Sequence, residues 1–270
     1  MHPAAARLLH RLVALVAPVH PISDALWLPT VAHYPFLATL PLQDQAKLRA
    51  LAALFLRRKE FTGARGLAIT DEMAVAIAAQ ACLPLLHWGS PRQALSWYDD
   101  FVGIVVHPTE ALAHRETMDA AGVVHHYNEV LLGEAMEHGP VMLVWPAVQG
   151  AGQRASSVVI HEFMHKIDMK AGHADGCPPL PPGFMATKTV REGRRLWRRA
   201  WSAVYTQFRE QVMMAERFGG EWPWLDAYGA SAPGEFFAVA CEAYFVDPTR
   251  FEQEFPTLKP LLDAFFRPAP

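Results

Sequence analysis

The spacing of apolar and polar residues along this chain predicts a mainly helical protein. Apolar residues recur at three- and four-residue intervals in several stretches, as Leu48, Leu51 and Phe55 do within residues 41–61. Such intervals place them along one face of a helix. Prolines such as Pro84 mark where several of these stretches stop. On these criteria, helices are predicted over residues 41–61, 71–83, 156–169, 190–218, 233–247 and 258–266.

Three short apolar runs, at residues 101–106, 126–132 and 141–145, predict strands. Gly139 and Pro140 separate the last two runs, so we expect these to form an antiparallel pair joined by a loop. The order of helices, a small sheet and further helices indicates an α+β protein rather than one built from alternating βαβ units.

The first 24 residues are expected to form a separate N-terminal segment. Leu8, Leu12 and Val16 recur at helical spacing there, but Arg7 and Arg11 interrupt the apolar run. What remains is too short to span a membrane and makes a poor secretory signal. We therefore expect a short amphipathic helix or a loosely held terminus over residues 1–24, a single domain over residues 25–270, and no membrane segment.

The composition indicates a globular protein of the cytoplasm. Of 270 residues, 51% are hydrophobic and 19% are charged. A formal net charge of −3 provides no basic field to hold nucleic acid, and the arginines clustered within residues 194–199 are expected on a solvated helix face. The three cysteines, Cys82, Cys177 and Cys241, are widely spaced, which fits a reducing compartment rather than a disulfide framework.

The string SSVVIHEFMHKIDM contains the arrangement His-Glu-x-x-His at His161, Glu162 and His165. On a helix, residues four apart share one face, so both imidazoles can bind one metal ion. A catalytic zinc ion has three protein ligands and one open position for water. Glu162 can reach that water, take up its proton as a general base, and pass the proton to the leaving amine.

The same pattern also occurs by chance in a chain with 13 histidines. The alternative is a helix that carries two structural histidines. The apolar residues around the motif favour a buried helix with a metal site, because Val158, Val159 and Ile160 precede it and Phe163 and Met164 fill its two free positions.

A third metal ligand must come from another element. Glu235 and Glu242 are seven residues apart on the predicted helix 233–247, hence on one face, and charged groups in so apolar a helix are costly to bury unless paired or bound to metal. Periodicity does not choose between them. Asp168, three residues after His165, either accepts the second ring N–H of a ligand histidine or is an exposed residue at the end of its helix.

Two blocks of sequence, VVIHEFMHKIDM and LDAYGASAPGEFFAVACEAYF, resemble the Mlc titration factor A family of zinc peptidases, which belongs to the gluzincin group. A Phe-Pro near the end of the chain belongs to the same pattern. A weaker match extends over the LxxLAxxFLxxK helix that starts at Leu48 and over the strands up to Trp145, so the resemblance covers about residues 25–265.

The resemblance implies a gluzincin-like α+β fold that is rich in helices, with a small, mostly antiparallel sheet and the His-Glu-x-x-His motif on its active-site helix. It implies one zinc ion per chain, with Glu235 of Pro233-Gly234-Glu235 as the third ligand and Glu242 as an outer-shell residue. It also implies that Tyr228 stabilises the oxyanion of the tetrahedral intermediate. Members of the family show aminopeptidase-like activity, and in some bacteria they bind the Mlc repressor of glucose-uptake genes.

Two functions therefore remain open at this point. The first is a cytoplasmic zinc peptidase, aminopeptidase-like, that acts on peptides and possesses a role in sugar uptake through an Mlc-like repressor. The second is a regulatory protein that binds and sequesters a transcription factor without catalysis. The presence of a base and an oxyanion donor favours the enzyme, because a structural metal site requires neither. The sequence indicates no residue that would bind the free amine of a substrate.

Overall fold

The computed structural model describes residues 20–109, 111–118, 124–131 and 133–268. The first 19 residues of the predicted N-terminal segment lie outside this range. The helices, listed in chain order, are α2 (Asp24–His33), α3 (Pro35–Ala38), α4 (Leu42–Arg58), α5 (Asp71–Cys82), α6 (Pro91–Leu95), α7 (Trp145–Gln149), α8 (Val158–Asp168), α9 (Val190–Phe218), α10 (Pro233–Val246), α11 (Pro248–Glu254) and α12 (Lys259–Phe266). The strands are β1 (Glu60–Gly63), β2 (Gly103–His107), β3 (Ala111–Met118), β4 (Val124–Leu131), β5 (Gly133–Ala135) and β6 (Val141–Val144).

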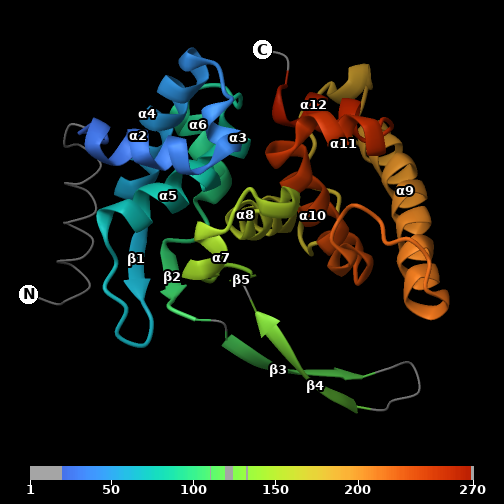
Figure 1. Ribbon diagram of the computed structural model, residues 1–270. Helices are drawn as coiled ribbons and strands as arrows, with labels where there is room; N and C mark the ends of the chain where they lie inside the picture. The colour runs from blue at the N-terminus through green and yellow to red at the C-terminus, as the bar shows by residue number, and fades with distance from the viewer. Residues whose placement is uncertain (1–19, 110, 119–123, 132, 269–270) are drawn as a thin grey trace, which may run out of the picture.

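Helix α8 lies between two groups of helices. In Figure 1, α2 to α6 stand on one side of it and α9 to α12 on the other, with α10 next to α8. On the first side, the ring of Phe163 from α8 packs against Tyr98 at a centroid distance of 4.8 Å and against Phe55 at 5.7 Å. On the second side, Phe236 and Phe237 of α10 each lie 5.6 Å from the ring of Trp201 on α9. Aromatic layers therefore fix both α8 and α10 in place.

The six predicted helices are confirmed as α4, α5, α8, α9, α10 and α12, with small shifts at their ends. The first ends at Arg58 rather than near residue 61, because residues 60–63 form β1. Helix α10 ends at Val246, before Pro248, as its sequence predicts. The helices α2, α3, α6, α7 and α11 were not predicted, and all except α2 have seven residues or fewer, too few for a periodic pattern to emerge.

The prediction of a mostly antiparallel sheet is wrong for the main sheet. Its four strands have the order β1-β2-β6-β5, and both β1–β2 and β2–β6 are parallel. Between β1 and β2 the chain passes through α5 and α6, a crossover of the kind that parallel neighbours need. Only the edge strand β5 runs antiparallel to its neighbour β6.

The predicted pairing of residues 126–132 with 141–145 is also wrong. Strand β4 pairs with β3 in a separate antiparallel ribbon, and β6 takes the three-residue strand β5 as its antiparallel partner. In Figure 1 this ribbon projects from the body of the protein, below the sheet. A strand as short as β5 shows no alternation of apolar and polar residues, so the sequence pattern could not indicate it.

Within the described part of the chain, none of the helices combines the length and the apolar character that crossing a bilayer requires. All three cysteines are buried free thiols.

Candidate metal centre

The start of α8 sets the orientation of its two histidines. The Oγ of Ser157 caps the helix by accepting the N–H of Ile160 at 3.2 Å. One turn and two turns further on, His161 and His165 leave the same face, which is turned toward α10. Each side chain is only 12% exposed, so the pair is largely buried between the two helices.

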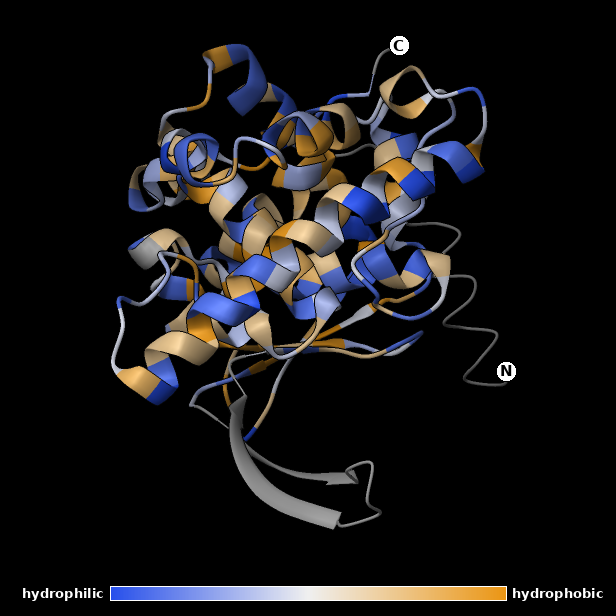
Figure 2. Ribbon diagram, turned by 90° about the vertical axis from the view of Figure 1, so that its right-hand side faces the viewer, coloured by the Kyte–Doolittle hydropathy of each residue, from blue (hydrophilic) through white to orange (hydrophobic). Residues whose placement is uncertain are grey.

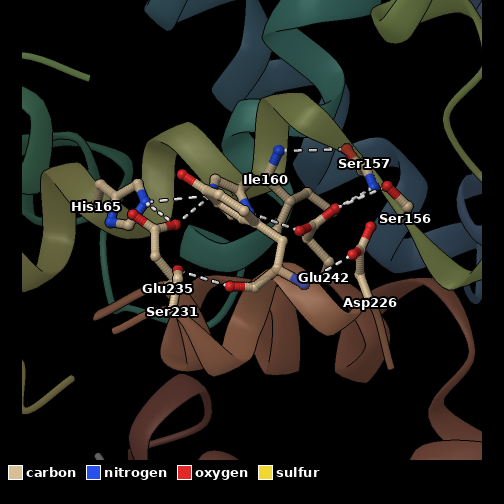
Figure 3. A network of polar contacts seen from close by, with 10 residues as sticks. Ser156, Ser157, Ile160, His165, Asp226, Ser231, Glu235 and Glu242 are labelled. Atoms are coloured by element: carbon tan, nitrogen blue, oxygen red, sulfur yellow. Dashed lines mark hydrogen bonds and ion pairs between the residues drawn. The ribbon is translucent and has the colours of Figure 1, made fainter. Parts of the chain in front are cut away.

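Helix α10 supplies a carboxylate to this pair. Glu235 lies in the first turn of the helix, behind Pro233. Its Oε2 is 3.1 Å from Nε2 of His161 and 3.1 Å from Nε2 of His165, and the two Nε2 atoms are 3.2 Å apart. Figure 3 shows Glu235 directed from α10 toward His165 on α8. The structure therefore brings together the three residues that the sequence and the family resemblance nominate as ligands.

The arrangement fits a small divalent cation. The three atoms form a nearly equilateral triangle with sides of 3.1, 3.1 and 3.2 Å, and their residues satisfy the geometry of a three-ligand metal group. A tetrahedral zinc ion bound at about 2.0–2.1 Å keeps its ligand atoms about 3.3 Å apart. Two imidazoles and one carboxylate are also a donor set that occurs in catalytic zinc sites.

The charges around the triangle are those that a metal ligand set requires. Burial acts to raise the pKa of Glu235, but hydrogen bonds to His161 and His165 outweigh it and hold that pKa well below its usual range. The carboxylate therefore stays ionised. Burial acts to lower the pKa of His161, yet the nearby carboxylates, Glu242 foremost, raise it well above its ordinary value. Protons and metal compete for this imidazole, so metal affinity falls as pH is lowered.

Glu242 binds the other ring nitrogen of His161. Nδ1 of His161 donates to Oε1 of Glu242 at 2.7 Å, which leaves Nε2 free to act as a ligand. Oε2 of Glu242 accepts the backbone N–H of Ser157 at 2.6 Å and the hydroxyl of Ser156 at 3.0 Å. The network continues to α5, because the Ser157 hydroxyl donates to Oε1 of Gln80 at 2.8 Å. Figure 3 shows Glu242 reaching from α10 to the two serines that precede α8.

Glu162 lies outside the triangle, buried between α8 and the edge strand β5. Its side chain is 4% exposed. Burial raises its pKa to about 8, with the charges of Glu235, Glu242 and Glu134 adding to the effect and His161 opposing it. A carboxyl group that changes its protonation near neutral pH is suited to take up and release a proton during a reaction.

Gly133 of β5 provides the space that Glu162 occupies. A Cβ atom built on Gly133 would lie 2.5 Å from Oε1 of Glu162, far inside contact distance. The ammonium group of Lys166, on α8, donates to the carbonyls of Met136 and Gly139 at 2.5 and 2.8 Å and so ties the turn after β5 to this helix. The edge strand and the carboxyl group are therefore held in one fixed relation.

If the chain hydrolyses peptides, as its sequence predicts, the substitution Gly133→Ala should lower kcat/KM by about 100-fold, because a misplacement of roughly 1 Å at a catalytic group has that effect. The added methyl group meets the movable end of a side chain rather than backbone, so Glu162 shifts while the fold persists. Steady-state kinetics and thermal unfolding measure the two effects. Gly103→Ala on β2 is the matched control, since its Cβ would come no closer than 3.4 Å to Pro140. Equal activity in both variants would contradict the assigned position of Glu162.

A family model described as the glucose-regulated metallo-peptidase M90 matches residues 10–267. The chain belongs to this family. Its relatives include proteins named Mlc titration factor A. The one from Edwardsiella ictaluri is 33% identical over 244 residues, which cover 90% of this chain and 87% of the relative. The one from Salmonella arizonae is 31% identical over 250 residues, 92% of each chain, and the one from Yersinia pestis is 30% identical over 238 residues, 87% and 82%.

The resemblance seen in the sequence blocks is thus confirmed, and membership of the M90 metallo-peptidases implies a metal ion. The triangle formed by His161, His165 and Glu235 is a site in the described part of the chain that fits one.

Tyr228 lies on the solvent-exposed side of the site formed by His161, His165 and Glu235. It belongs to the short 3-10 turn η6 (Ala227–Ala230), its side chain is 41% exposed, and its ring centroid is 6.1 Å from that of His161. Its backbone N–H donates to Oδ1 of Asp226 at 2.9 Å, and its carbonyl accepts the hydroxyl of Ser231 at 2.7 Å. Both partners are visible in Figure 3. The turn therefore places Tyr228 next to the predicted ligands, on the side that faces solvent.

Neither of the two interpretations of Asp168 is correct. It does not accept the second ring N–H of a ligand histidine, and it is not an exposed residue at the end of its helix. It is fully buried, and its Oδ2 accepts the backbone N–H of Gly176 at 2.7 Å. Its Oδ1 is buried without a hydrogen-bond partner in the structure. The residue anchors the loop that follows α8, while Glu242 has the position beside a ligand histidine that was considered for Asp168.

Asp168→Asn is expected to gain stability relative to the wild type as pH rises. Burial raises the pKa of Asp168 to about 7, against about 3.9 in an unfolded chain. Because the folded pKa is the higher one, the stabilising contribution is complete below about pH 4 and is lost as pH rises through about 7. Asparagine does not ionise, so its advantage should grow by on the order of 2 kcal/mol between about pH 5 and pH 8. Urea unfolding of metal-free protein measures this, and parallel pH curves would refute it.

Several residues of the site were absent from the sequence-based list. Ser156 and Ser157 had a local signal, because serine directly before an apolar helical run is a typical N-cap. Gly133 and Lys166 had none, since their roles depend on β5 lying next to α8, a contact between segments distant in sequence.

Proposed function

We propose that this chain is a zinc-dependent peptidase of aminopeptidase-like type. One observation carries the proposal: the donor atoms of His161, His165 and Glu235 converge, and the buried carboxyl group of Glu162 lies beside them. The M90 family supports a metallo-peptidase in general. The identity of the metal, the hydrolytic activity and the preference for amino termini are parts of the proposal.

A zinc ion held by these residues would supply a Lewis acid that polarises the substrate carbonyl and acidifies water. Glu162 would accept a proton from the attacking water and donate it to the leaving amine nitrogen. Its raised pKa suits both steps, since the group can hold the proton between them. Glu242 would keep His161 in the tautomer whose Nε2 faces the cation. The phenol of Tyr228 would donate a hydrogen bond to the carbonyl oxygen as charge develops on it.

The edge of the sheet offers a way to hold a peptide. Strand β5 is the last strand of the four-stranded sheet, and Gly133 on it touches Glu162. We propose that an extended substrate pairs with β5, because an unpaired strand edge binds peptide backbone through its N–H and C=O groups. The scissile bond would then lie between this strand and the histidines of α8.

A regulatory function is the second candidate, because relatives of this chain are named Mlc titration factor A. We propose that the protein also recognises an Mlc-like transcriptional repressor, which places it in the cytoplasm, in agreement with its three free thiols. In the alternative form of this proposal the chain sequesters the repressor and has no catalytic activity.

Metal analysis and digestion of a peptide library test the proposed function. We expect one zinc ion per chain, cleavage that a chelator abolishes and added zinc restores, and products that begin at amino termini. Cleavage at internal bonds would replace the aminopeptidase assignment by an endopeptidase. A zinc-loaded protein that cleaves nothing in the library, yet binds a purified Mlc-like repressor, would establish the non-catalytic alternative.

A further inference from the structure

A groove runs along the outward face of α9, away from the metal centre. It has a volume of about 820 Å³. In Figure 2, α9 crosses the face of the molecule nearest the viewer, and orange and blue residues alternate along it. The residues of α9 that line the groove fall between Glu192 and Gln207, and Thr187 and Thr257 line it from neighbouring segments. The side chains of the metal centre are on the opposite side of α10, toward α8, so the groove is a separate surface.

The floor of the groove is apolar, and two of its four side chains are short. Leu196, Ala200, Ala203 and Val204 follow one another at intervals of four, three and one residues, a spacing that keeps them on one stripe of the helix. Leu196 is 36% exposed, so its side chain contributes apolar surface to this stripe. Two alanines in the middle of the stripe allow the backbone of another helix to approach closely.

One rim of the groove is positively charged. The first ten residues of α9, from Val190 to Arg199, contain five arginines and one glutamate, whereas the whole chain has a net charge of −3. Arg195 and Arg199, one turn apart, line the groove, and among the described residues no carboxylate lies within ion-pair distance of either. The glutamate, Glu192, already accepts the backbone N–H of Lys188 at 2.9 Å. The sequence predicted a solvated basic face here, and the structure adds an apolar floor beside it.

We propose that this groove binds an acidic amphipathic helix of a partner protein. The lining residues of α9 span sixteen positions from 192 to 207, or about 24 Å at 1.5 Å per residue, which matches about four turns of a bound helix. Such a helix places its apolar stripe on the alanines and its carboxylates against Arg195 and Arg199. A nucleic acid would leave the apolar floor unused. The proposal does not depend on peptidase activity.

A displayed library of helical peptides of about 18 residues tests the proposal directly. The bait is the full chain with Glu162→Gln, which prevents loss of peptides by cleavage. We expect enrichment of sequences with an apolar stripe flanked by aspartate and glutamate. Their dissociation constants are then measured by fluorescence anisotropy on the bait and on variants of it.

The double substitution Arg195→Glu/Arg199→Glu is expected to weaken the enriched peptides at least about 10-fold, and Ala203→Arg should weaken them similarly by filling the floor. The matched control is Arg209→Glu/Arg217→Glu, which reverses two exposed arginines on the same helix outside the groove and should change affinity less than about twofold. Thermal unfolding verifies that all variants fold. Enrichment of no acidic amphipathic sequence, equal weakening by the control, or tighter binding of a single-stranded oligonucleotide at the same arginines would overturn the proposal.

Discussion

The Glu162→Gln protein is expected to retain its metal ion and to lose hydrolytic activity by about 10²- to 10⁴-fold, the range attributed to a general base. Glutamine has the same shape as glutamate but cannot accept a proton at this position. The side chain lies outside the ligand triangle, so the metal should remain bound. Because burial already disfavours the charge of Glu162, removing that charge should not lower stability.

Metal content per chain and kcat/KM on a peptide that the wild type cleaves measure the two effects. Glu134→Gln is the matched control, since it removes a carboxylate next to Gly133 on β5 that influences the charge state of Glu162 without taking its place. Its activity should remain close to that of the wild type. Undiminished cleavage by Glu162→Gln would rule out this residue as the base, while loss of the metal would show that Glu162 supports the ligands.

The second large effect distinguishes the roles of the two glutamates of α10, Glu235 and Glu242. Glu235→Ala should abolish tight zinc binding, because it leaves two ligands, whereas Glu242→Ala should weaken binding by about 10- to 100-fold, as expected for a residue that orients a ligand. Both substitutions also lower the stability of the metal-free protein. Glu242→Ala leaves the N–H groups of His161 and Ser157 without their acceptor, at about 1–3 kcal/mol for each buried group, and Glu235→Ala removes the carboxylate that faces Nε2 of His161 and of His165.

Competition with a fluorescent chelator measures the zinc affinities, and thermal unfolding with and without zinc measures the linked stability. A ligand present at about 1,000 times its dissociation constant stabilises the folded state by about 4 kcal/mol, so the wild type should show a clear shift that Glu235→Ala lacks. Two variants with the same zinc affinity, or a Glu242→Ala protein that binds zinc less well than Glu235→Ala, would reverse the assignment of ligand and orienting residue.

The helical part of the fold and the core of the site could be read from local patterns. The intervals between apolar residues predict α4, α5, α8, α9, α10 and α12, because each is long enough for one buried face to repeat. His161 and His165 are ligand candidates on the same ground, since four residues of helix fix the relative direction of two side chains whatever surrounds them. The strand pairing escaped prediction because hydrogen-bonded partners in a sheet are distant in sequence, as β1 is from β2 and β2 is from β6.

By itself, the sequence determined that two imidazoles and one carboxyl group would share a helix, and that an apolar helix with two glutamates would follow. Only the tertiary structure decided what each glutamate touches. Seven residues of helix separate Glu235 and Glu242 by about 10 Å along the axis, and the two nitrogens of one imidazole point in different directions. Packing α10 against α8 places Glu235 at Nε2 of His161 and Glu242 at Nδ1, a distinction that depends on the position of one helix relative to the other and that no periodicity within either helix contains.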